Sequence, residues 1–502
     1  MMETVERGRM TERGIFNGAV WTMIAALVTA SVIAGLRRTL WLDEIYTLRV
    51  LDAGDLPHIL QAIWQGADTQ PPLYFIAAFG VRKMFPGSVG ALRIFSSLCT
   101  IGGIILLSRF FRHKILPPAI PVTLLFFVVS PLFGAFLISE LRSYALYFFF
   151  AVIFLISYDR MVSARGSRVL NEGMVLLSAT ALLYTHYFGI VHYIAFFTLT
   201  VALEKRYPTS RETILLLVPI VLFLPWIPAV FRQLAQVHYL TWQTKPSAVD
   251  VLQMVRFSFG AAGWILFCVL IIANGLSHGF SGVRMWYVTR PKTAILLAAF
   301  LVCPVLLFLL AVFGIGIWNE KYIQPAYGAA VVLLGIQVQS LVRSPGFLQV
   351  VIVAGLCALG GERLAGRVRE MDVDRRKMEA QVRLVSPGVP VVCESPHTFY
   401  PLAYYARLAG RPDVYLVRDW ESAAAGGSVK DATFDFFQVQ TALFRDSCII
   451  SYDELKRRFP KFYLIQEEGR MFFDYRIKTN ASYVITQVND AVLEVQKRYA
   501  RR

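Results

Sequence analysis

Two adjacent carboxylates, Asp43 and Glu44, follow directly after the first long apolar segment of the chain. Ionised groups are costly beside hydrocarbon, so a carboxylate pair where a membrane segment ends is a candidate functional site. Charged and amphipathic side chains continue through Tyr46, Arg49 and Asp68 before the next strongly apolar segment begins. We interpret this long first loop as the floor of a catalytic cavity.

Further polar clusters interrupt the apolar pattern. They are residues 70–74 (Gln-Pro-Pro-Leu-Tyr), 140–144 (Glu-Leu-Arg-Ser-Tyr), 319–322 (Asn-Glu-Lys-Tyr) and, more weakly, 185–188 (Thr-His-Tyr-Phe). With the topology given below, all of these clusters lie at the outer ends of membrane spans. Because they gather on one side of the membrane, we expect them to line one shared site together with the carboxylate pair.

The composition indicates a membrane protein. Of 502 residues, 56% are hydrophobic and 14% aromatic, and only 17% are charged. A soluble domain cannot bury that much apolar surface, so most of it must face lipid. The formal net charge of +16 does not indicate nucleic-acid binding, because the basic residues occur in short clusters between apolar segments.

About eleven apolar segments are long enough to cross a membrane. They are residues 15–36, 92–111, 116–138, 143–158, 173–188, 189–204, 213–231, 262–277, 293–315, 323–342 and 346–361. The first is too long for a signal peptide and is expected to be a retained anchor. With the N-terminus in the cytoplasm, most basic clusters fall in inner loops, as the positive-inside rule requires; Arg37, Arg38, Arg82 and Lys83 are exceptions. We therefore predict a multi-pass α-helical protein of the cell inner (plasma) membrane.

Two domains are expected. Residues 1–361 would form the transmembrane domain, with residues 37–91 as its first outer loop, and residues 362–502 a soluble α/β domain on the outer face. Residues 71–85 are too short to cross and are interpreted as an amphipathic helix at the membrane interface, with two prolines at its start. In the second domain, helices are expected near 362–383 and 400–408, and strands near 389–393, 414–417, 461–465 and 483–486.

The six cysteines show no spacing typical of a structural zinc site. Two of them, Cys393 and Cys448, lie in the polar second domain. They form a disulfide if the compartment is oxidising, or they are two buried thiols.

The polar clusters, taken in order, resemble the motifs of the GT-C glycosyltransferases. The set is Asp-Glu after the first span, Pro-Pro-Leu-Tyr at 71–74, Ala-Leu-Arg-Ile-Phe-Ser at 91–96, Glu-x-Arg-x-Tyr at 140–144 and Lys-Tyr-Ile-Gln-Pro at 321–325. In these motifs the chain is similar to the bacterial enzymes of glycosyltransferase family 39, a group like the protein O-mannosyltransferases and the lipid A aminoarabinose transferases. The resemblance covers roughly residues 15–330, and the C-terminal domain resembles the family's outer domain only in position and class.

The resemblance implies an inverting transfer of a sugar from a polyprenyl-phosphate donor to a hydroxyl of a lipid, protein or glycan acceptor outside the membrane. It implies that Asp43 is the general base, since a hydroxyl is a poor nucleophile until a carboxylate takes its proton, and that Glu44 assists. The negative charge that grows on the lipid phosphate needs cations or a metal. The candidate donor-binding and substrate-binding residues are Arg93, Arg142, Glu140, Lys321, Tyr322, Gln70, Tyr74 and His186.

Two positions depart from the family pattern. Gln70 stands where the family often carries His or Lys, which removes a cation that could contact the donor phosphate. Lys321 replaces an arginine, which keeps the charge and loses the planar fork. A divalent metal cation is a candidate cofactor, with Asp43 and Glu140 as candidate ligands.

Structural interpretations compete with these roles. Arg93 and Arg142, the candidate contacts to the donor phosphate, could each be an anchor at the membrane interface. Glu140 could form an ion pair with Arg142, and His186 could be a packed side chain. A lipid-linked sugar transporter or flippase is a second hypothesis for the whole chain, but transporters place ionisable groups near mid-membrane on broken helices. A third is a non-catalytic partner that binds polyprenyl lipids; Asp43 argues against it, and Gln70 leaves it open.

Overall fold

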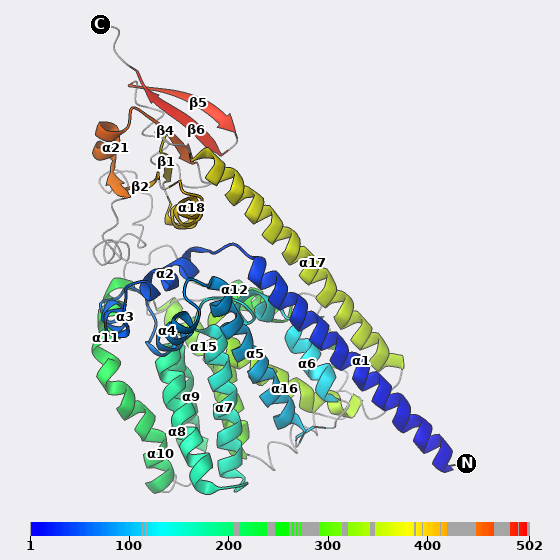
Figure 1. Ribbon diagram of the computed structural model, residues 1–502. Helices are drawn as coiled ribbons and strands as arrows, with labels where there is room; N and C mark the ends of the chain where they lie inside the picture. The colour runs from blue at the N-terminus through cyan, green and yellow to red at the C-terminus, as the bar shows by residue number, and fades with distance from the viewer. Residues whose placement is uncertain are drawn as a thin grey trace. The chain divides into compact units, whose positions relative to one another are not determined.

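The computed structural model is traced in Figure 1. It describes residues 2–112, 114–115, 119–203, 210–237, 246–260, 264–265, 268–269, 272, 291–313, 320–341, 347–385, 388–393, 395–411, 413–418, 448–465, 482–489 and 491–498. Contacts divide the chain into two compact units. The first contains residues 1–37, 70–227 and 245–368, and the second residues 38–69, 228–244 and 369–502.

The first unit is helical. Its helices are α1 (Met2–Arg37), α4 (Leu73–Met84), α5 (Val89–Phe111), α6 (Ala119–Val128), α7 (Tyr144–Val162), α8 (Arg168–Thr185), α9 (Phe188–Leu203), α10 (Ser210–Phe223), α12 (Ala248–Phe259), α15 (Pro291–Val312), α16 (Gln324–Leu341) and the first part of α17 (Phe347–Leu384). In the described part of the chain, five helical stretches are long and apolar enough to cross a membrane: Asn17–Arg37, Val89–Phe111, Tyr144–Val162, Arg211–Leu234 and Thr293–Val312. Three shorter apolar helices are Ala119–Val128, Phe188–Thr200 and Gln324–Ile336.

Helices occupy almost all of the predicted apolar segments, and two details differ. The segment 116–138 is not one helix, because α6 ends at Val128 and a π-helical turn follows at Phe133–Leu137. The last apolar segment and the charged helix expected after it form one continuous helix, α17. The segment 262–277 lies mostly outside the described residues.

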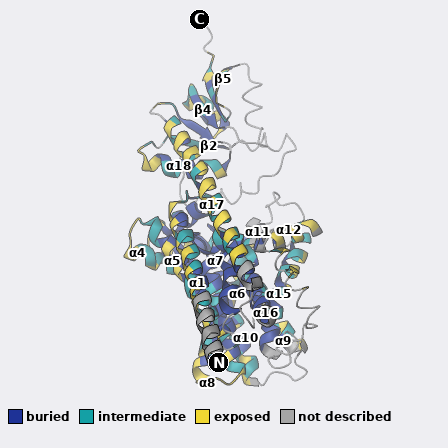
Figure 2. Cartoon of the chain, turned by 90° about the vertical axis from the view of Figure 1, so that its right-hand side faces the viewer, coloured by how far each residue is buried: buried dark blue, intermediate teal, exposed yellow. Residues whose placement is uncertain are grey.

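Helix α7 lies at the centre of the first unit, where it packs against α5, α8, α15 and α16. Its most apolar stretch is 61% buried, whereas that of α1 is 22% buried, so α1 leaves most of its apolar surface for lipid (Figure 2). The contact between α5 and α7 is close at Gly103, where a Cβ atom would lie 2.5 Å from the ring of Phe148. A glycine is required there because any side chain would push the two helices apart.

The second unit contains a six-stranded sheet with the strand order β3-β2-β1-β4-β6-β5. The strands are β1 (Val391–Cys393), β2 (Val414–Arg418), β3 (Ile449–Ser451), β4 (Lys461–Ile465), β5 (Tyr483–Asn489) and β6 (Val492–Lys497). The first four in this order pair in parallel, and β6 pairs antiparallel with β4 and β5. Helices α18 (Pro396–Leu408) and α21 (Tyr452–Arg458) pack against the sheet. This is the α/β domain that the sequence predicts.

Cys393 and Cys448 are thiols, so the disulfide alternative is wrong. Cys393 ends β1, while Cys448 precedes β3, and β2 lies between these two strands. Neighbouring strands are about 4.8 Å apart, so two strands of separation exceed the Cα distance of about 4.4–6.8 Å that a disulfide allows.

Two short helices in the predicted first loop also belong to the second unit: α2 (Leu42–Leu51) and α3 (Leu56–Trp64). The carboxylate of Asp55 caps α3 by accepting a hydrogen bond from the backbone N–H of His58 (3.1 Å). The side chain of Gln233, in α11 (Ile227–Val237), donates to the carbonyl of Ile63 near the other end of α3 (2.8 Å). These bonds give the loop a fixed structure.

Candidate active site

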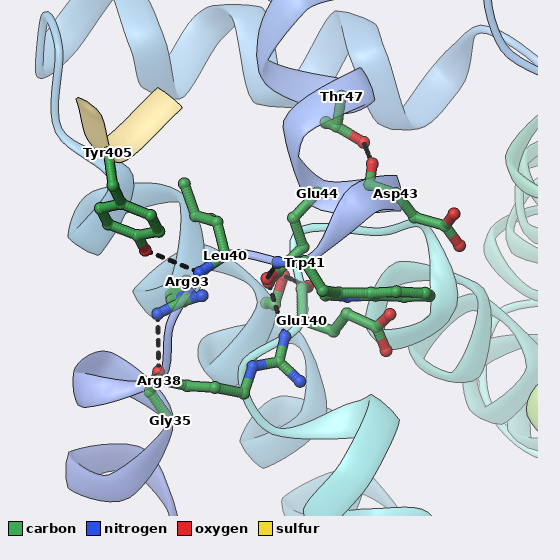
Figure 3. A network of polar contacts seen from close by, with 11 residues as sticks. Gly35, Arg38, Leu40, Trp41, Asp43, Glu44, Thr47, Arg93, Glu140 and Tyr405 are labelled. Atoms are coloured by element: carbon green, nitrogen blue, oxygen red, sulfur yellow. Dashed lines mark hydrogen bonds and ion pairs between the residues drawn. The ribbon is translucent and has the colours of Figure 1, made fainter. Parts of the chain in front are cut away.

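The carboxylate pair lies in the first turn of α2, and its two members have different surroundings (Figure 3). Glu44 is fully buried; one oxygen pairs with Arg38 (2.7 Å) and the other accepts the backbone N–H of Trp41 (3.4 Å). This carboxylate therefore caps α2 and neutralises Arg38, a basic residue that the positive-inside pattern leaves unexplained. Asp43 is partly exposed, and its side chain points away from that of Glu44. Of the two, Asp43 is the carboxylate that a substrate could reach.

Helix α2 is held by helix α18 of the α/β domain. The phenol oxygen of Tyr405 accepts a hydrogen bond from the backbone N–H of Leu40, two residues before α2 begins (2.7 Å). The ring of Tyr400 lies edge-on to Tyr46 (5.1 Å between centroids), and the guanidinium of Arg49 lies over it (4.9 Å). Three contacts therefore fix the helix that carries Asp43.

The first predicted arginine, Arg93, lies in the second turn of α5 and is 2% exposed. Its Nη1 donates to the carbonyl of Gly35 in the last turn of α1 (2.9 Å), where a helix leaves its carbonyls without partners. Gly35 also allows a close approach, since a Cβ there would lie 2.1 Å from the hydroxyl of Ser139. Arg93 thus joins α5 to the end of α1, whatever it contributes to substrate binding.

The second predicted arginine, Arg142, is bound by Gln70, and both side chains are buried. Hydrogen bonding sets the orientation of the Gln70 amide. Its oxygen accepts from Nη2 (2.5 Å) and Nε (3.1 Å) of Arg142, and its nitrogen donates to the hydroxyl of Ser143 (2.7 Å). The residue that departs from the family pattern is therefore a neutral acceptor that fixes one edge of the guanidinium fork.

Three of the polar clusters meet in a group of rings that we call the aromatic cluster. It consists of Tyr144, Tyr147, His186, Phe188 and Tyr322. The ring of His186 lies 5.7 Å from Tyr144 and 5.4 Å from Tyr322, measured between centroids, and the rings of Phe188 and Tyr322 are 4.2 Å apart. Residues distant in sequence therefore share one place in the first unit.

His186 lies in the turn between α8 and α9 and is buried. The Nδ1 of its imidazole accepts a hydrogen bond from the backbone N–H of Phe188 (3.2 Å). Arg142 lies two residues before Tyr144, and Lys321 lies one residue before Tyr322, so both cations adjoin the aromatic cluster in the chain.

The remaining predicted residues also lie in the first unit. Glu140 is buried, and its carbonyl accepts a hydrogen bond from the hydroxyl of Ser96 in α5 (2.7 Å). Tyr74 lies at the start of α4 and is also buried. Asn319 falls outside the described residues. The clusters at 70–74, 140–144, 185–188 and 320–322 thus belong to the first unit, whereas Asp43 and Glu44 belong to the second.

Within the described residues, no three His, Cys, Asp or Glu side chains gather as metal ligands. The divalent metal on Asp43 and Glu140 therefore stays a prediction, and no chemistry is assigned to it below.

Sequence reasoning did not identify several residues that shape the site. The hydroxyl of Tyr147 forms a hydrogen bond with Nδ1 of His192 (2.6 Å). The sulfur of Cys303 lies 3.4 Å from the same nitrogen. All three side chains lie inside apolar helices, so only their polarity within those helices could have identified them. Tyr400 and Tyr405 carry no signal in the sequence, because their partners, Tyr46 in α2 and Leu40 just before it, are more than 350 residues away.

Comparisons with known proteins give a fold. No protein-family model and no curated protein matches the sequence. Among solved structures, ArnT from Cupriavidus metallidurans bound to undecaprenyl phosphate is similar, with a TM-score of 0.60 and 14% identity over 95% of this chain and 98% of that chain. ArnT from the same organism in the apo state gives a TM-score of 0.57 and 13% identity over 95% and 97%. The chain therefore has the fold of ArnT, and the predicted fold class, a helical membrane protein with a C-terminal α/β domain, is confirmed.

Proposed function

We propose that this chain is an integral-membrane glycosyltransferase that moves a sugar from a polyprenyl-phosphate donor to the hydroxyl of a lipid, protein or glycan acceptor. The observation that carries the proposal is the likeness to ArnT along nearly the whole chain, because that protein was crystallised with undecaprenyl phosphate. The proposal places the protein in the plasma membrane, with a cytoplasmic N-terminus and the site on the extracytoplasmic side.

The proposed reaction is a single displacement. The acceptor hydroxyl oxygen attacks the anomeric carbon of the sugar, and its proton passes to Asp43. The bond from the anomeric carbon to the phosphate oxygen breaks, and the polyprenyl phosphate leaves with the electron pair. Attack from the face opposite to the leaving group inverts the anomeric configuration. The partial exposure of Asp43 suits this role, and the buried contacts of Glu44 suit it to hold Asp43 in place.

Arg142 is proposed to bind the donor phosphate. Its guanidinium is held on one edge by the neutral Gln70, so the side chain is oriented without a carboxylate at that edge. A preoriented cation stabilises the charge that develops on the leaving phosphate, because it need not reorganise during the reaction. Lys321 would add a second positive charge beside the aromatic cluster, whose rings would pack against the sugar or the lipid.

The proposal is tested by Asp43→Asn, with Asp52→Asn at the exposed end of α2 as the matched control. The loss of a general base should lower transfer by about 10²–10⁴-fold without unfolding the protein. Cells that carry only the Asp43 variant should accumulate polyprenyl-linked sugar and lack an outer-surface glycan modification, whereas the control should match the wild type. Unchanged pools of both the lipid-linked sugar and the surface glycan would reject the transferase.

A further inference from the structure

A buried glutamine, Gln324, begins helix α16 two residues after Tyr322. Its side chain is fully buried, yet neither its amide oxygen nor its amide nitrogen forms a hydrogen bond with a described residue. Buried polar groups in folded proteins rarely lack a partner, because an unpaired group loses its bonds to water and gains none in return. The amide of Gln324 therefore has an acceptor and a donor that a ligand can use.

A second buried glutamine, Gln70, shows the bonds of an amide with a structural role. Its oxygen accepts from Arg142, and its nitrogen donates to the hydroxyl of Ser143. In that case the fold itself supplies partners for both ends of the amide. Gln324 has no such bonds to the described part of the chain, which indicates that its partner is a bound molecule.

Two contacts bracket Gln324 where α16 faces α7. Just before it, the ring of Tyr322 lies 6.4 Å from that of Tyr144 at the start of α7, measured between centroids. One turn after it, a Cβ atom at Gly328 would lie 3.8 Å from the ring of Phe148, one turn further along α7. Residues four apart share one face of a helix, so Gln324 and Gly328 both face α7. Gln324 therefore lies at the level of Tyr144, at the edge of the aromatic cluster.

The direction of the side chain follows from the geometry of α16. Side chains of an α-helix lean toward its N-terminal end, and the turn before α16 carries Tyr322. On the other side, Tyr327 packs against α6, where its hydroxyl donates to the carbonyl of Phe126 (2.9 Å). The protein core thus closes the C-terminal side of Gln324, and its amide extends toward the rings of the aromatic cluster.

An amide selects a particular kind of ligand. Its oxygen accepts and its nitrogen donates, so it pairs with a molecule that presents a donor and an acceptor side by side. Two neighbouring hydroxyl groups of a sugar ring present such a pair, because each hydroxyl can donate or accept. The C–H faces of the same ring can pack against aromatic side chains. A polyprenyl chain presents neither a donor nor an acceptor, so the amide suits the sugar and not the lipid tail.

We propose that Gln324 binds two neighbouring hydroxyl groups of the donor sugar, one through its amide oxygen and the other through its amide nitrogen. The sugar then lies beside the aromatic cluster, and its phosphate reaches Arg142, two residues before Tyr144. This assignment rests on the proposed function and adds a residue that recognises the sugar, whereas Arg142 recognises the phosphate.

The first experiment measures thermal unfolding of the ligand-free protein in detergent. Gln324→Leu removes the unpaired amide and keeps a side chain of similar size, so the unfolding midpoint should rise by about 2–4 °C. The matched control is Thr200→Val, because the hydroxyl of Thr200 is also buried without a partner among the described residues, three turns along α9 from the aromatic cluster. The control should raise the midpoint too. An unchanged or lowered midpoint for Gln324→Leu would show that the amide already has a partner, which would overturn the proposal.

The second experiment compares two probes that differ only in the sugar, undecaprenyl phosphoglucose and undecaprenyl phosphate. Their affinities are measured by calorimetric titration of the full-length protein in the same detergent. The wild type and Thr200→Val should bind the glycosylated lipid equally. Gln324→Leu should bind it about 5-fold to 150-fold more weakly, the loss expected for two hydrogen bonds. All three proteins should bind undecaprenyl phosphate with the same affinity.

The remaining outcomes separate this proposal from the proposed function. Equal losses of affinity for both lipids would assign Gln324 to the phosphate or to the fold, and an unchanged affinity for both would deny it a ligand. Either result would overturn the sugar contact while leaving the polyprenyl-phosphate donor in place. A wild type that binds neither lipid would instead reject that donor, and the sugar contact would be rejected with it.

Discussion

Replacing Gln70 should separate the stability of the protein from its affinity for the donor. The Gln70 oxygen accepts two hydrogen bonds from Arg142, at 2.5 and 3.1 Å, and both residues are buried. Gln70→Glu keeps an acceptor at this position and adds a negative charge. The pair should then be at least as stable, but the guanidinium would be partly neutralised before the donor arrives. Gln70→Leu removes the acceptor and leaves two N–H groups of Arg142 without their hydrogen-bond partner.

The size of each effect follows from these contacts. A hydrogen bond to a charged group contributes about 1.5–3 kcal/mol, so Gln70→Leu, which removes two such bonds, should lower the free energy of unfolding by at least about that amount. A similar loss of phosphate binding in Gln70→Glu corresponds to a donor KM that is roughly 10-fold to 150-fold higher, since 1.4 kcal/mol is a factor of ten. Gln70→Lys, which restores the family's cation, should destabilise the protein because a lysine cannot accept from Arg142.

The assays are sugar transfer at a series of donor concentrations and thermal unfolding in detergent. Gln61→Glu makes the same chemical change on an exposed face of α3 and serves as the control. The expected pattern is a raised donor KM with an unchanged unfolding midpoint for Gln70→Glu, and a lowered midpoint for Gln70→Leu. A Gln70→Glu enzyme with the donor KM of the wild type would refute the proposed role of Arg142. A Gln70→Leu protein that unfolds at the wild-type midpoint would refute the hydrogen bonds themselves.

Three further changes test other contacts. Tyr405→Phe keeps the ring but leaves the N–H of Leu40 without its acceptor, at a cost of about 1–3 kcal/mol. Amide hydrogen exchange at the start of α2 should therefore accelerate. Sugar transfer should slow, while the KM for the donor stays unchanged. Asp159→Asn leaves the buried ammonium of Lys114 without its carboxylate, so the free energy of unfolding should fall by about 3–5 kcal/mol; an unaltered melting curve would contradict a structural ion pair. His186→Leu removes the acceptor of the backbone N–H of Phe188, so the free energy of unfolding should fall by about 1–3 kcal/mol. An unchanged unfolding midpoint in this variant would contradict the hydrogen bond.

The sequence predicted the elements whose pattern is local. Apolar segments gave helices such as α5 and α7, and alternating residues gave strands such as β4 and β5. The order of spans also predicted that the clusters around Arg142, His186 and Tyr322 would approach each other, and in the first unit they do. Periodicity was sufficient for the helices and strands because each depends on a single segment. Topology was sufficient for the clusters because the number of spans before each one determines the side of the membrane on which it lies.

Features that depend on distant partners could not be predicted. Helices α2 and α3 lie in what the sequence analysis treated as a long loop, because both helices are short and α2 is held by the distant residues Tyr400 and Tyr405. The departure at Gln70 suggested the loss of a phosphate contact, but only the structure shows that its amide binds Arg142 instead.

The bond between Leu40 and Tyr405 spans 365 positions and has a consequence for biosynthesis. A ribosome translates the N-terminal carboxylate pair early, yet the partner that secures it emerges only when four-fifths of the polypeptide has been made. A product that ends before Tyr405 therefore lacks the contact that holds the start of α2. If the proposed function is correct, we expect such a fragment to be inactive in transfer, because the helix that carries Asp43 is not held in place.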